Sequence, residues 1–172
     1  KYLFNKKIYI EKKVIFRYNK MISNFQVQEV RFLEKVMVHL KGRQKDAQGR
    51  TTKIQMSAEG EHYLKAGKHY VKYMDNSIDK DAPVSTMLKI AEDSLTIIRQ
   101  GAIGGTQRFQ KDVEHNSDYR TPYGILELKL RTTKLDISYG DVAGEVDFCY
   151  DVIVNGEFSG HNKLSIVISK LK

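Results

Sequence analysis

The chain has 172 residues, which is enough for one domain with a substantial core. Hydrophobic residues make up 41% and charged residues 29%, and no apolar run approaches the roughly 18 residues of a membrane-spanning helix. Two prolines and twelve glycines exclude collagen-like and low-complexity chains, and ten tyrosines with seven phenylalanines exclude disorder, so a soluble globular domain with no membrane partner is expected.

The net charge of +8 is concentrated at the N-terminus. Residues 1–20 contain seven lysines and arginines against Glu11 alone, so this segment carries +6 and the rest of the chain +2. We interpret residues 1–20 as a basic N-terminal extension and residues 21–172, beginning at Met21, as one domain. The extension is either a segment upstream of the true start at Met21, or otherwise dispensable, or it is a basic arm whose interleaved aromatic residues contact phosphates and stack on bases. Nucleic acid is expected as a partner only through this segment.

After Met21 the dominant pattern has period two, which is typical of half-buried β-strands. Val36, Val38 and Leu40 alternate with polar residues, residues 45–50 supply turn formers, and the alternation resumes at Ile54, so a hairpin is predicted. Similar runs occupy residues 70–74, 126–130, 146–154 and 164–168. Asn155-Gly156, between the last two runs, is the strongest hairpin signal in the chain. About nine strands with short turns predict an antiparallel barrel or sandwich.

Residues 86–100 fit two patterns. Met87, Leu88, Ala91, Leu95 and Ile98 form a passable helical stripe, but alternation on either side of a Glu92-Asp93 turn fits two strands equally well. Frequent β-branched residues favour the two strands.

Several short motifs occur in a recognisable order between residues 30 and 169. They are Gly60 with Tyr63 and Lys65, Tyr70-Val71-Lys72-Tyr73, Leu95 to Arg99 with Gly101, Phe109, Thr121-Pro122-Tyr123-Gly124, and Asn162 with Leu164 and Ile166. In order and spacing the chain resembles the YwiB-like family of uncharacterised bacterial proteins, a domain of unknown function among the calycin-like, or lipocalin-like, barrels. The resemblance implies an all-β, antiparallel calycin-like barrel of about 8–10 strands. It brings no established activity and no catalytic residues.

Arg99 is the leading candidate binding residue because it shares strand parity with Leu95 and Ile97 and should point into the barrel with them. An inward guanidinium either caps the barrel through hydrogen-bonded partners or anchors a carboxylate- or phosphate-bearing ligand. Tyr73, Tyr119 and Tyr123 are the accompanying ligand-binding candidates. The stretch from Thr121 to Gly124 is suited to a structural corner. Tyr119 and Tyr123 either belong to this corner or line the rim of the barrel mouth, where they could contact a ligand.

No catalytic constellation is visible. The five histidines are scattered without metal-ligand spacing, and neither a Gly-x-Ser-x-Gly nor a phosphate-loop motif occurs, so catalytic residues, metals and cofactors are not expected. The single cysteine, Cys149, cannot form an intrachain disulfide, which favours a reducing, cytoplasmic location.

The interpretation that these features favour is a non-enzymatic barrel that binds a small apolar or anionic ligand. The alternative is a protein- or RNA-interaction module with a solid barrel core, for which a dimer would be a natural state.

Overall fold

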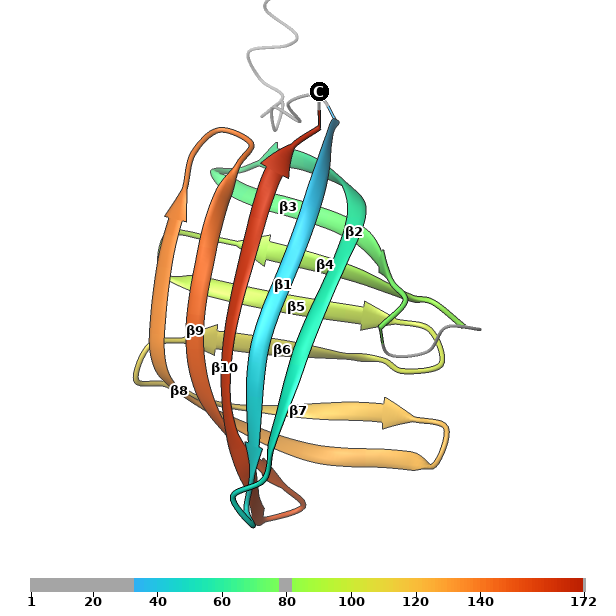
Figure 1. Ribbon diagram of the computed structural model, residues 1–172, viewed down its shortest axis with the longest axis vertical. Coiled ribbons are helices and arrows are strands. Elements are labelled where there is room, and N and C mark those ends of the chain that lie inside the picture. The colour runs from blue at the N-terminus through green and yellow to red at the C-terminus, as the bar shows by residue number, and fades with distance from the viewer. Residues whose placement is uncertain (1–32, 78–81, 172) are drawn as a thin grey trace, which may run out of the picture.

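A computed structural model describes residues 33–77 and 82–171, and within them every regular element is a β-strand (Figure 1). The predicted basic extension and the predicted start at Met21 lie outside the described residues. In chain order the strands are β1 (Glu34–Asp46), β2 (Thr51–Lys65), β3 (Lys68–Asp75), β4 (Val84–Ile90), β5 (Ser94–Gln100), β6 (Gly105–Gln110), β7 (Glu114–Thr121), β8 (Gly124–Tyr139), β9 (Gly144–Val154) and β10 (Glu157–Lys170).

The ten strands form one antiparallel sheet in the order β6-β5-β4-β3-β2-β1-β10-β9-β8-β7. The sheet curls until its two edges meet, where Gly104, directly before β6, pairs with Arg120 of β7. The N–H of Gly104 donates to the carbonyl of Arg120 (3.0 Å), and the N–H of Arg120 donates to the carbonyl of Gly104 (2.7 Å). Figure 1 shows β1, β9 and β10 along the long axis of the view, with β3 to β6 crossing behind them. The predicted all-β, antiparallel barrel is therefore confirmed, with ten strands in a nearly closed arrangement.

The hairpins form where turn residues interrupt the alternation. Between β1 and β2, the Asp46 carboxylate accepts hydrogen bonds from the backbone N–H of Gln48 (3.0 Å) and of Arg50 (2.9 Å). Between β9 and β10, Asn155 and Gly156 have φ angles of 48° and 86°, the pair of positive values that a type I′ turn requires. Both predicted hairpins are present.

The ambiguous segment 86–100 consists of two strands. β4 pairs with β5 in antiparallel register, for example Leu88 with Ile97, and the turn between them contains Glu92 and Asp93. The alternation prevailed over the helical stripe because each strand buries its apolar face against the barrel interior, with Leu88, Leu95 and Ile97 at most 3% exposed.

The core fills much of the barrel interior. Its aromatic centre is formed by Phe109 and Phe148, each 1% exposed, with Tyr150 against them; both ring-centroid distances from Phe109 are 4.8 Å. Gly60 allows close packing between β2 and β3: a Cβ added to it would lie 2.8 Å from the Lys72 carbonyl oxygen and 3.3 Å from the Tyr73 Cβ. The space beside Gly60 is thus taken by the protein itself.

Irregularities in two strands bend the sheet. The register between β10 and β9 shifts between Phe158 and Gly160, and that between β8 and β9 shifts between Thr132 and Lys134. At Gly160 the neighbouring strand comes very close, because an added Cβ would lie 2.3 Å from the Lys45 carbonyl oxygen. Such bulges increase local twist and help a sheet to close.

Candidate ligand-binding cavity

A cavity of about 300 Å³ remains inside the barrel, near the ends of β3 and β5. This volume is at the lower end of the range for small-molecule sites. Its apolar wall comes from the inward faces of five strands, namely Leu40, Ile54, Met56, Leu128, Leu130, Val152 and Leu164. Its polar groups are Gln44, Asp75, Ser77, Arg99, Gln107, Tyr119, Tyr150 and Asn162. The cavity therefore combines an apolar body with a set of convergent polar groups.

Arg99 supplies the cation of the cavity. It lies near the end of β5, and its Nη1 donates a hydrogen bond to Oε1 of Gln107 on the adjacent β6 (2.6 Å). Its Nε is buried and has no hydrogen-bond partner among the described residues. Arg99 is thus held at Nη1 by Gln107, while the side chain as a whole is half-buried and lines the cavity.

Asp75 supplies a carboxylate. It ends β3, is 3% exposed, and accepts hydrogen bonds from the backbone N–H (2.9 Å) and the hydroxyl (2.5 Å) of Ser77. The cavity therefore contains fixed groups of both signs.

Two tyrosines complete the polar lining. Burial raises the pKa of Tyr150 to about 12, an effect that the positive charge of Arg99 partly opposes. Burial also raises the pKa of Tyr119, where Arg99 acts to lower it and Asp75 to raise it. Both hydroxyls therefore keep their protons at neutral pH and act as neutral hydrogen-bonding groups.

The four predicted site residues have different positions. Arg99 and Tyr119 line the cavity together. Tyr73 is 3% exposed within the core and is not a lining residue, although Arg99 and Asp75 both influence its pKa, which burial raises. Tyr123 is 99% exposed in the turn between β7 and β8, away from the cavity lining.

The stretch from Thr121 to Gly124 forms a tight corner. The Thr121 hydroxyl accepts a hydrogen bond from the Tyr123 N–H (3.2 Å) and donates to the Gly124 carbonyl (3.0 Å). Gly124 has a φ of 130°, in the region that favours glycine. The corner consequently directs Tyr123 outward.

Sequence reasoning missed three polar residues that line the cavity with Arg99, of which Gln107 is bonded to it. Gln44 and Gln107 have the same strand parity as the core residues Leu40 and Phe109, so a search for polar side chains at core parity would have found them. Asp75 shares parity with Tyr73 and could have been found in the same way.

A histidine pair lies elsewhere in the barrel. His62, 2% exposed, and His69 place Nε2 and Nδ1 3.0 Å apart, and the Tyr139 ring lies 4.3 Å from that of His69. Burial lowers the pKa of both histidines, and in His62 the charge of His69 lowers it further. The pair is therefore held neutral. Among the described residues no three His, Cys, Asp or Glu side chains are grouped to hold a metal ion.

Comparisons with known proteins agree with this architecture. Residues 38–166 match the family described as Domain of unknown function (DUF1934). The chain is 28% identical over 123 residues to the uncharacterized beta-barrel protein YwiB of Bacillus subtilis (strain 168), covering 71% of this chain and 84% of that protein. The crystal structure of the ywiB protein from Bacillus subtilis superposes with a TM-score of 0.73 at 23% identity, covering 87% of this chain and all of that one. In the described segments, no helix has the length and apolar character needed to cross a membrane.

Proposed function

The chain belongs to the family of the domain of unknown function DUF1934, and we propose that it binds a small molecule in the barrel cavity without catalysing a reaction. The ligand has an apolar body and an anionic group, either a carboxylate or a phosphate. The observation that carries the proposal is the half-buried Arg99 side chain, which Gln107 holds in place and which lines a cavity with an apolar wall.

The energetics of burial support an anionic ligand. A charge-assisted hydrogen bond contributes about 1.5–3 kcal/mol, so a ligand acceptor that reaches the half-buried Arg99 guanidinium is stabilised by about this amount. Arginine is especially suited to carboxylate and phosphate oxygens because its planar donors can bind two of them at once. Gln107 supports this role by holding Nη1 in place.

The apolar wall and Asp75 define the rest of the ligand. Leu40, Met56 and Leu128 would cover a hydrocarbon or aromatic body, for which burial contributes about 25 cal/mol per Å². Asp75 accepts hydrogen bonds, so a donor on the ligand would be accommodated beside it. A cavity of about 300 Å³ favours this function over a module with a solid core.

The proposal can be tested with the dye 8-anilinonaphthalene-1-sulfonate, which has an aromatic body and one anionic group. We expect the full chain to bind the dye and Arg99→Gln to raise its Kd at least about tenfold, because a charge-assisted hydrogen bond contributes about 1.5–3 kcal/mol. Arg108→Gln is the matched control, since Arg108 is exposed on the outer face of β6. Circular dichroism must show that both variants keep the fold, because dyes of this kind also bind loosened states.

Native mass spectrometry of the protein purified from cells provides a second measurement. A retained small molecule that is lost in Arg99→Gln and kept in Arg108→Gln is the expected result. Equal dye affinity in both folded variants, together with a bare polypeptide mass, would contradict the proposal.

A further inference from the structure

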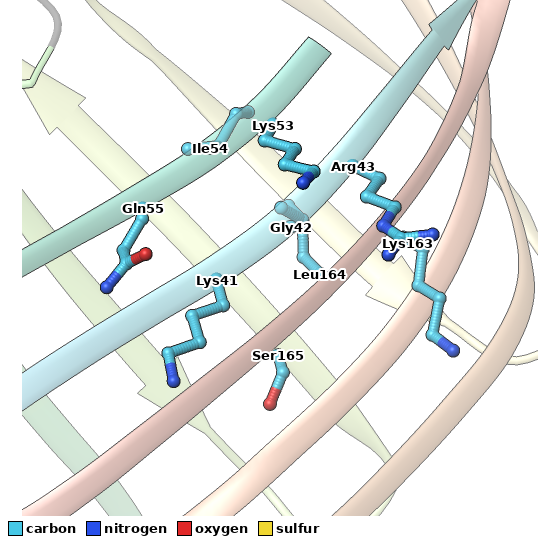
Figure 2. A pocket seen from close by; sticks show the side chains of 9 residues that line it. All are labelled: Lys41, Gly42, Arg43, Lys53, Ile54, Gln55, Lys163, Leu164 and Ser165. Atoms are coloured by element: carbon cyan, nitrogen blue, oxygen red, sulfur yellow. The ribbon is translucent and has the colours of Figure 1, made fainter. Parts of the chain in front are cut away.

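The outer face of the barrel carries a row of cations on three neighbouring strands. Arg43 on β1 pairs directly with Lys53 on β2 and with Lys163 on β10. Lys41 lies two residues before Arg43 on the same face of β1, and it pairs with Gln55 on β2 and with Ser165 on β10. The four basic side chains are all exposed, and Figure 2 shows them around one hollow. We call Lys41, Arg43, Lys53 and Lys163 the basic row.

No member of the basic row has an ion pair among the described residues, whereas other cations on the outer face do. Lys35 pairs with Glu61 (2.9 Å), and Lys134 pairs with Asp136 (2.6 Å). The nearest acidic positions on β9 are Asp147 and Asp151, each one same-face position away from Cys149, which pairs with Lys163. Asp151 contacts His161 and makes no ion pair with a member of the row. Like charges placed directly opposite one another destabilise a sheet, so the row carries an energetic cost that no ion pair within residues 33–77 and 82–171 offsets.

The surface at the row is hollowed. The hollow has a volume of about 550 Å³, and Gly42, between Lys41 and Arg43 on β1, is one of its lining residues (Figure 2). Gln55 and Ser165 add uncharged hydrogen-bonding groups, of the kind that accompany lysine and arginine in phosphate contacts. Of its apolar residues, Leu164 belongs to the barrel core and Ile54, which is partly buried, packs against that core.

We propose that the basic row binds the phosphate backbone of a nucleic acid. Adjacent strands are about 4.8 Å apart, so Lys53, Arg43 and Lys163 form a line roughly 10 Å long that suits consecutive phosphates of one strand. Lysine is depleted in protein–protein interfaces, which disfavours a protein partner. Within the described part of the chain no aromatic side chain lines the hollow, so the contact is to phosphates and independent of base sequence. This inference does not depend on the cavity ligand, and it assigns nucleic-acid binding to the barrel itself rather than to residues 1–20.

The test uses the full 172-residue chain and a fluorescein-labelled 20-nucleotide oligouridine, with affinity measured by fluorescence anisotropy at several salt concentrations. The variant combines Lys53→Gln, Arg43→Gln and Lys163→Gln. For single strands each phosphate contact contributes about 0.7 to the slope of log K against log salt, so the slope should fall by about 2. At 0.1 M salt this corresponds to an affinity loss of up to about 100-fold.

The matched control removes the same number of charges elsewhere, with Lys68→Gln, Lys72→Gln and Arg108→Gln on exposed positions of β3 and β6. Residues 1–20 are present in every protein, so their charge contributes equally. We expect the control to stay within about threefold of the wild type. Arg99→Gln should also leave oligouridine binding unchanged, which separates this proposal from that of the cavity ligand.

Three outcomes would overturn the proposal. The first is that the wild-type chain does not bind oligouridine. The second is that the two triple variants lose affinity equally, which would mean that binding depends on net charge alone. The third is that the wild-type chain binds polyglutamate or phosphatidylserine vesicles more tightly than oligouridine and that the triple variant of the basic row loses this binding. That result would assign the row to an acidic protein or a membrane surface.

Discussion

Replacing Phe109 by alanine tests whether the aromatic cluster holds β6 in the barrel. Phe109 is 1% exposed, and its ring packs against Phe148 and Tyr150, at 4.8 Å from each. A buried Phe→Ala change costs about 3–5 kcal/mol, and each aromatic contact accounts for about 0.5–1.5 kcal/mol beyond the buried area. Domains of this kind are stable by about 5–15 kcal/mol, so the variant loses a large part of its stability.

The assay is urea unfolding followed by circular dichroism and tyrosine fluorescence, since the chain has no tryptophan. In a thermal scan the same loss would lower Tm by about 6–20 °C. Phe158→Ala is the control, because Phe158 is 45% exposed, and it should cost less than about 1 kcal/mol. If the two variants lost equal stability at an unchanged m-value, the cluster would not be what retains β6, and the reasoning would be refuted.

Two further predictions concern the histidine pair and the bulge in β10. Folding lowers the pKa of His62 and of His69 below the ordinary 6.5, so as pH falls through about 6.5 the unfolded chain binds protons more readily than the folded chain does. The free energy of unfolding should therefore fall from pH 7 to pH 5, and a folded His62→Phe/His69→Phe variant should show a flatter pH profile in urea unfolding. Gly160→Ala should cost about 1–3 kcal/mol, because the new Cβ would meet a backbone carbonyl at 2.3 Å. Gly140→Ala, where the nearest atom is 3.5 Å away, should cost less than about 1 kcal/mol, and equal losses would contradict this account.

The cavity and the basic row lie on opposite faces of the same strands. Ile54 and Leu164 border both, so at this point the wall between the two proposed sites is one sheet thick. Successive side chains of a strand point to opposite faces of the sheet, so Gln44 faces the cavity, whereas Arg43 faces the outer hollow. Variants on one face can consequently test one proposal without altering the groups of the other.

Much of the fold could be predicted because its determinants are local. Alternation places Val36, Val38 and Leu40 on one face whatever the neighbouring strands are, and Asn155-Gly156 specifies its turn by conformational preference alone. The inward direction of Arg99 followed from the same alternation. The exposed position of Tyr123 could not be predicted from the alternation, because the geometry of the corner, and not the strand parity, directs that side chain.

The amino-acid sequence by itself determined which residues form strands, where the chain turns and which face of each strand is apolar. Only the tertiary structure decided which strands are neighbours and in what register. Asp75 and Gln107 come from separate strands and share a cavity with Arg99, and Arg43 meets Lys163 across a separation of 120 residues. The physical reason is that alternation of apolar and polar residues indicates only which face of a strand is buried. Barrel closure and register depend instead on pairing between segments that are distant in the chain.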